Sequence, residues 1–144
     1  MDYHEFVGEV QHRLELPGMG EAVRVIRAVL LTLGERIQAG EASDLAGPLP
    51  MEIDRFLLEA ESGQQFDFDE FVGRVAERAG LEDDEDGRPE AVYYAQAIVA
   101  LLAEIVPGSE FEEVRANVPD DDFEQLFELV GVDEAFEEEM ERSN

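Results

Sequence analysis

Apolar side chains recur every three or four positions from the start of the chain, the spacing of one face of an amphipathic helix. A first stripe begins at Tyr3, and a second begins at Phe68. Two longer stripes cover residues 22–37 and 91–106, and the second of these is apolar on nearly every side. No stretch alternates apolar and polar residues beside a hairpin turn signal, so no strands are predicted. We therefore expect an all-α protein with the two long helices at its centre.

Polar residues and helix breakers mark where these helices begin and end. Asp2 and Asp67 each precede a stripe, and a glutamate follows each of them three residues later. Such an aspartate accepts hydrogen bonds from the free N–H groups of the first helical turn, so both are predicted to be N-caps. Gly40 is predicted to end the first long helix, because glycine is common just beyond a helix C-terminus.

Shorter segments complete each half of the pattern. A third helix is predicted over residues 41–47 and again over residues 110–117. A fourth amphipathic segment follows Pro50 in the first half and Pro119 in the second, because proline interrupts the preceding helix. The last residues, 132–144, are predicted to form a terminal helix.

The two halves of the chain are similar enough to be copies of one unit. Residues 2–16 align with residues 67–81, and eight of these fifteen positions are identical. From residue 22 the offset changes from 65 to 69, which places a four-residue insertion in an acidic loop. Matched positions include Arg13 with Arg78, Glu35 with Glu104, Arg24 with Tyr93, and Arg27 with Gln96.

This repeat predicts the domain organisation. We expect one all-α domain over residues 1–144, a pseudo-two-fold helical bundle of two tandem four-helix units. The first unit covers residues 1–63 and the second covers residues 64–131. Residues 132–144 form a C-terminal helical tail in this prediction.

Three motifs within the pattern resemble a known prokaryotic family. The first is Asp2-Tyr3-x-Glu5-Phe6-Val7, which returns as Asp67-Phe68-x-Glu70-Phe71-Val72. The others are Ala28-Val29-Leu30-x-x-Leu33-Gly34-Glu35-Arg36 and Gly40-Glu41-Ala42-x-Asp44-Leu45-x-x-x-Leu49-Pro50. Over about residues 2–130 the chain resembles the family called domain of unknown function 2267. The resemblance implies an all-helical duplicated domain with no established activity and no known catalytic residues.

Composition changes the picture by indicating the solvent in which the protein works. The chain carries 37 acidic and 10 basic side chains, all ten of them arginine, for a net charge of −27. Leu, Ile, Val and Phe still make up 42 residues, enough for an apolar core, so disorder is not expected. Repulsion among carboxylates destabilises a compact state in dilute buffer, and concentrated salt screens it. We therefore expect a haloarchaeal-like protein of a multimolar-salt cytoplasm.

The same composition narrows the classes of partner. A polyanion is repelled by nucleic acid and by anionic membranes, so neither is expected as a partner. The chain has no cysteine, which excludes disulfides and thiolate metal sites. Residues 1–6 contain neither a basic leader nor an apolar segment, so we expect no secretory signal and a cytoplasmic location. We also find no catalytic constellation and expect neither an enzyme nor a cofactor.

The acidic loop at residues 82–87 is the only candidate metal site in the sequence. Asp83, Asp84 and Asp86 precede a glycine, as oxygen ligands do in some calcium loops. The register differs from such a loop, because Tyr93 stands where a bidentate carboxylate is required. The other interpretation is a solvated acidic loop before the next helix, entered through Pro89 near its first position.

Charge is distributed unevenly between the halves, which suggests a contact face. Residues 1–60 hold 11 acids and 5 arginines, whereas residues 61–144 hold 26 acids and 5 arginines. Arg24 and Arg27 lie on the polar side of the first long helix, and arginine can bind carboxylates or phosphates with two hydrogen bonds. They either pair with nearby acids such as Glu21 or form a docking face for a protein partner.

Two functional hypotheses follow from the sequence. The first is a non-enzymatic helical interaction or regulatory module, binding a protein partner or a second copy of itself through Arg24 and Arg27. The alternative is a sensor of small molecules or divalent cations that uses the cleft between the repeats or the acidic loop at residues 82–86. Gly8 and Gly73 occupy matched mid-helix positions, where either another segment approaches closely or the helix simply faces solvent.

Overall fold

In the computed structural model, Asp2 and Asp67 begin helices α1 (Tyr3–Arg13) and α5 (Phe68–Ala79) in the same way. In each case the aspartate Oδ1 accepts a 2.9 Å hydrogen bond from the backbone N–H three residues later, at Glu5 or Glu70. The bond satisfies one of the N–H groups that the first turn of a helix leaves free. Both predicted N-caps are confirmed.

The structure describes residues 1–118 and 121–131, and within these ranges it contains helices and no strands. The other helices are α2 (Met19–Arg36), α3 (Ala39–Ala46), α4 (Met51–Leu58), α6 (Gly87–Ile105), α7 (Gly108–Ala116) and the 3-10 helix η1 (Asp121–Phe127). The predicted all-α fold class is confirmed. Pro119 and the predicted terminal helix at 132–144 lie outside the described residues.

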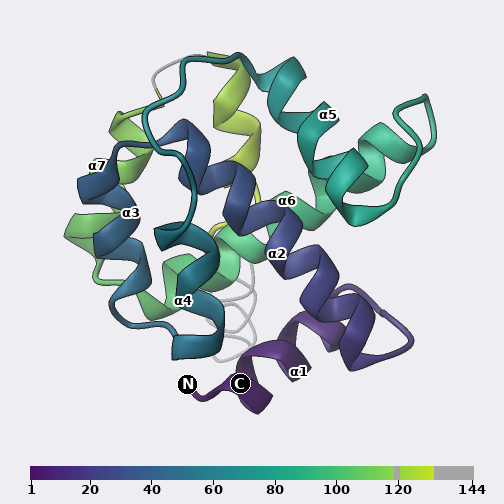
Figure 1. Ribbon diagram of the computed structural model, residues 1–144, viewed down its shortest axis with the longest axis horizontal. Helices are drawn as coiled ribbons and strands as arrows, with labels where there is room; N and C mark the ends of the chain where they lie inside the picture. The colour runs from purple at the N-terminus through teal and green to yellow at the C-terminus, as the bar shows by residue number, and fades with distance from the viewer. Residues whose placement is uncertain (119–120, 132–144) are drawn as a thin grey trace, which may run out of the picture.

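Helices α2 and α6 are the central elements, as their apolar patterns predict. Figure 1 shows α2 crossing the middle of the molecule with α6 behind it, and the shorter helices α3, α4 and α7 gathered at one end. Eleven residues of α2 and ten of α6 are buried, which places both helices in the core. Within the described residues, no helix combines the length and apolar character needed to cross a membrane.

The end of α2 differs from the prediction. The helix stops at Arg36, and Gly40 lies in the first turn of α3 instead of terminating α2. The cause is Ile37, whose backbone is extended, with φ −89° and ψ 170°, and whose side chain is buried. Burial of this isoleucine bends the chain out of the helix before glycine is reached.

The helices around the two central ones do not pack equally. Helix α5 lies along α2 over much of its length, whereas α1 contacts α6 at only a few positions. Figure 1 shows α1 at the lower edge of the molecule, diverging from the centre. One central helix is therefore covered, and a space remains between α1 and α6.

The core is continuous between the halves of the chain. A single cluster of buried apolar side chains includes residues from α1 through η1. Phe123 of η1 makes edge-to-face contacts with Phe68 and Phe71 of α5, with ring centroids 5.4 and 5.7 Å apart. Aromatic contacts of this geometry add to the free energy gained from burial alone. They hold η1 against the base of α5.

Candidate functional site

Two matched ion pairs join the first half of the chain to the second, and Arg74 of α5 adds a third contact to Glu35 at 3.2 Å. Arg78 of α5 places Nη1 and Nη2 at 2.6 and 2.9 Å from the two carboxylate oxygens of Glu35 in α2. Arg13 of α1 places Nη1 2.7 Å from one oxygen of Glu104 in α6 and Nη2 3.1 Å from the other. The sequence alignment matches these arginines with each other and these glutamates with each other, but did not by itself indicate that they touch.

The pair between α5 and α2 lies in a well-packed polar network. Arg78 also donates a 2.8 Å hydrogen bond to the hydroxyl of Thr32, which donates to the carbonyl of Ala28 at 2.7 Å. Arg74 donates to Glu35 at 3.2 Å and stacks on Phe66, with 4.0 Å from its Cζ to the ring centroid. Every polar group of this network therefore has a partner.

The network also determines the charge state of Glu35. Burial by itself would raise the pKa of this carboxyl, because the charged form loses water. Hydrogen bonds and positive charge from Arg78 and Arg74 outweigh burial and hold the pKa of Glu35 below its usual range. Glu35 is consequently ionised and fixed, which makes it a structural group.

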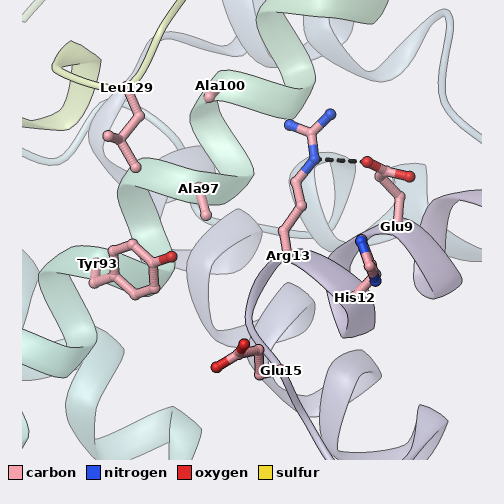
Figure 2. A pocket seen from close by; sticks show the side chains of 8 residues that line it. All are labelled: Glu9, His12, Arg13, Glu15, Tyr93, Ala97, Ala100 and Leu129. Carbon is pink, nitrogen blue, oxygen red and sulfur yellow. Dashed lines mark hydrogen bonds and ion pairs between the residues drawn. The ribbon is translucent and has the colours of Figure 1, made fainter. Parts of the chain in front are cut away.

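The side between α1 and α6 is open and forms a cleft of about 530 Å³. Figure 2 shows α1 on one wall, α6 on the other, and Leu129 near the upper rim. The lining side chains are Glu9, His12, Arg13, Glu15, Tyr93, Ala97, Ala100 and Leu129. This cleft lies between the halves of the chain, where the sensor hypothesis places a binding site.

Charged groups in the cleft are partly neutralised within it. Arg13 bonds to Glu9 at 2.7 Å through Nε, in addition to its pair with Glu104. The hydrogen bond to Glu104 has the largest effect, and together with the bond to Glu9 it raises the pKa of the Arg13 guanidinium above its usual value. Glu15 makes no ion pair among the described residues. The guanidinium of Arg13 is therefore already paired with carboxylates, whereas the carboxylate of Glu15 has no cationic partner among the described residues and could pair with a ligand.

An exposed aromatic ring and small side chains supply the apolar part of the cleft. Tyr93 of α6 is 47% exposed, and its ring faces the cleft in Figure 2. Ala97 and Ala100 follow on the same helix and leave room beside its backbone. The cleft thus combines an aromatic surface, a shallow aliphatic wall and a free carboxylate.

Arg24 and Arg27 are both exposed on α2, as their place on its polar side predicts. Neither makes an ion pair within residues 1–118 and 121–131, whereas Arg13, Arg74, Arg78, Arg88 and Arg115 all do. The described residues therefore contain no ion pair between either arginine and a neighbour such as Glu21, which the first interpretation required. The guanidinium of Arg24 instead lies over Gly80 at the end of α5.

The carboxylates of the acidic loop have separate contacts. Asp83 binds Arg88 at 2.6 Å, and Asp84 accepts backbone hydrogen bonds from Asp86 and Gly87. In the part of the chain that the structure describes, no three side chains are placed to hold a metal ion. Helix α6 already begins at Gly87, so Pro89 is its third residue and not its first.

Among the residues that the structure describes, no neighbouring helix approaches the matched glycines Gly8 and Gly73 closely. A Cβ at Gly8 would meet no described atom within 4 Å. A Cβ at Gly73 would only reach the ion pair of Asp83 and Arg88, at ordinary van der Waals distance. The close approach occurs at Gly34, where a Cβ would lie 2.8 Å from Ala60 Cβ.

Comparison with known proteins supports the resemblance seen in the motifs. No curated protein matches the chain. The profile of the uncharacterized conserved protein family DUF2267 matches residues 3–126, which is most of the chain. The chain therefore belongs to the DUF2267 family.

Proposed function

We propose that this protein is a non-enzymatic helical interaction module that binds an acidic protein surface through Arg27 and its neighbours on α2. The observation that carries the proposal is the exposure of Arg24 and Arg27 without any ion pair among the described residues. Although the chain has 37 acids and 10 bases, five of its described arginines are held by carboxylates and these two are not. They give this face of α2 a charge opposite to that of most of the surface.

The neighbours of Arg27 suit a protein partner. Met19 and Val23 precede it at intervals of four residues, so the three side chains share one face of α2. Met19 is 40% exposed, and Val23 is partly exposed beside the core. Apolar surface flanking arginine is common at protein interfaces, where carboxylates of the partner bind the guanidinium. Nucleic acid is a poor candidate because the net charge of the chain is −27.

The scaffold in this proposal is a pseudo-two-fold bundle of two tandem four-helix units. Helix lengths of 11, 18, 8 and 8 residues are followed by lengths of 12, 19, 9 and 7 residues. The pairs Arg13 with Glu104 and Arg78 with Glu35 relate the halves reciprocally, as a two-fold arrangement requires. The module works in the cytoplasm of an extreme halophile, which the excess of carboxylates supports.

Affinity capture from a native cell lysate in multimolar KCl, with the purified chain as bait, tests whether the proposed face of α2 binds a partner. Arg27→Glu is compared with Arg55→Glu, because Arg55 is likewise exposed and without an ion pair among the described residues. We expect Arg27→Glu to lose a partner that the wild type and Arg55→Glu retain. Light scattering on the same variants detects self-association, which would identify a second copy as the partner. Identical partners and identical oligomeric states for all three proteins would overturn the proposal.

A further inference from the structure

The helices α1 and α5 end in the same backbone conformation. Glu15 and Gly80, which are matched in the sequence alignment, both have positive φ, 52° and 79°. Leu16 N–H bonds the carbonyl of Gln11, and Leu81 N–H bonds the carbonyl of Ala76 at the matched positions. This closing turn leaves other carbonyls of the last helical turn exposed, so the helix end attracts positive charge.

At the end of α5 a positively charged side chain of the protein itself lies over the closing turn. Arg24 reaches from α2 to Gly80, and its Nη2 lies 2.5 Å from the position that a Cβ atom of residue 80 would take. Only glycine lets a guanidinium approach the turn so closely. One of the two matched helix ends is thus filled by an internal cation.

At the end of α1 the corresponding place is open. Tyr93 occupies the position of α6 that matches Arg24 in α2, and Glu15 stands where α5 has Gly80. Figure 2 shows these two side chains along the lower part of the cleft between α1 and α6. Where α5 has a guanidinium over its closing turn, the matched place at the end of α1 is bordered, among the described residues, by an aromatic ring, a carboxylate and the cleft.

We propose that the cleft between α1 and α6 binds a small organic cation, a guanidinium or ammonium group on a short aliphatic chain. The charged group lies at the end of α1, where Glu15 pairs with it and the Tyr93 ring contacts it by a cation–π interaction. The aliphatic chain packs along Ala97 and Ala100. The cleft volume of about 530 Å³ falls within the range of small-molecule sites.

The alternative of an anionic ligand is disfavoured by the state of Arg13. Its guanidinium donates to Glu9 and Glu104 and lies 2.7 Å from the second oxygen of Glu104, so each of its three nitrogens already has a carboxylate partner and its charge is balanced by two acids. The other acidic or basic side chains of the cleft wall are the carboxylates of Glu9 and Glu15 and the imidazole of His12. The site is separate from the face around Arg27, and its binding does not depend on the proposed interaction partner.

Isothermal titration calorimetry with agmatine, which carries a guanidinium and an ammonium on a four-carbon chain, tests the proposal at constant KCl concentration. Butylurea is the matched uncharged probe. We expect saturable binding of agmatine and none of butylurea. Glu15→Gln should weaken agmatine binding about tenfold, because it removes one charge-assisted contact. Equal binding of both probes, or no saturable heat with agmatine, would overturn the proposal.

Tyr93→Arg is the sharpest variant, because it recreates at α6 the residue that fills the matched helix end. The new guanidinium should pair with Glu15, abolish agmatine binding and leave the melting temperature unchanged or higher. Gln96→Arg adds the same charge to the same helix outside the cleft lining and should retain binding. Unaltered agmatine binding by Tyr93→Arg would contradict the assignment of the site. Arg27→Glu should bind agmatine normally, which separates this test from that of the interaction face.

Discussion

Arg78 donates hydrogen bonds to both carboxylate oxygens of Glu35, with nitrogen to oxygen distances of 2.6 and 2.9 Å, and this contact links α5 to α2. The two side chains are only 25% and 12% exposed. In the matched pair Arg13 is 19% exposed, slightly less than Arg78, but Glu104 is 36% exposed, three times as much as Glu35. The same chemical contact therefore operates in two environments within one molecule.

Glu35→Gln should destabilise the protein much more than Glu104→Gln. Removing Glu35, the more buried carboxylate, leaves Arg78 without an ion-pair partner among the described residues, whereas Arg13 keeps Glu9 when the more exposed Glu104 is removed. We expect a loss of about 2 to 3 kcal/mol in the free energy of unfolding for Glu35→Gln. For Glu104→Gln we expect about 0 to 1 kcal/mol. Urea unfolding in multimolar KCl measures both values.

The double variant Glu35→Gln/Arg78→Met provides the control for that comparison. If Arg78 is costly because it is left unpaired, removing it as well should recover part of the lost stability. Additive losses would instead show that the two side chains act independently, and equal losses for Glu35→Gln and Glu104→Gln would contradict the role given to burial.

Lowering the pH should remove the contribution of Glu35 to the free energy of unfolding. Its pKa is lower in the folded state than in the unfolded chain, so the folded state binds the proton more weakly. The stabilisation is therefore complete above the ordinary glutamate pKa of about 4.3 and is lost as the pH falls through the folded-state value. The difference in unfolding free energy between wild type and Glu35→Gln should narrow from pH 7 toward about pH 3. A difference that stays constant over this range would refute the prediction.

Local features of the fold were predictable from the sequence because local interactions produce them. Asp2 and Asp67 act as N-caps through hydrogen bonds that span three residues, and the apolar stripes of α2 and α6 are buried as their periodicity indicates. Gly40 was misplaced because burial of Ile37, a tertiary effect, ended α2 earlier. Helix boundaries depend on such packing and not on propensity alone.

The sites themselves depend on contacts between distant residues, which periodicity does not reveal. Arg13 and Glu104 are 91 positions apart, and only their membership of matched pairs within the repeat hinted at a relation. The unequal packing of α1 and α5 opens the cleft, although the stripes of these two helices look alike in sequence. The exposure of Arg27 was predicted, but its lack of an ion pair required the positions of the surrounding acids.

Alanine substitutions at Gly8 and Gly34 should have opposite effects on the free energy of unfolding, because Gly8 lies on an open helix face and Gly34 on a crowded one. Gly8→Ala should raise the free energy of unfolding by about 0.5 to 1 kcal/mol, because glycine is unfavourable within a helix and the added methyl group meets no described atom. Gly34→Ala should lower it, because the methyl group would lie 3.0 Å from the carbonyl oxygen of Leu57 and closer still to Ala60. Thermal unfolding of both variants measures the effects. Destabilisation by Gly8→Ala would point to a contact at that position.

Salt dependence of stability tests the proposed halophilic character. Salt has two opposing effects here, since it weakens ion pairs such as that of Arg115 with Glu124 and also weakens repulsion among carboxylates. With 37 acids and 10 bases, most carboxylates have no arginine to lose, so relief of repulsion should dominate. We expect the urea midpoint to rise as KCl increases from about 0.1 M to multimolar concentrations.

Neutralising exposed acids should reduce this dependence. Glu85→Gln/Glu113→Gln removes two charges that form no ion pair among the described residues, and it should raise the midpoint of urea unfolding most at low salt.

The buried pair of Arg78 with Glu35 is shielded from ions, so Glu35→Gln should lower the midpoint of urea unfolding by a similar amount at every KCl concentration. A midpoint for the wild type that is the same at low and high KCl would exclude a requirement for salt. Such a result would leave the acidic surface to be explained by function instead of by solvent.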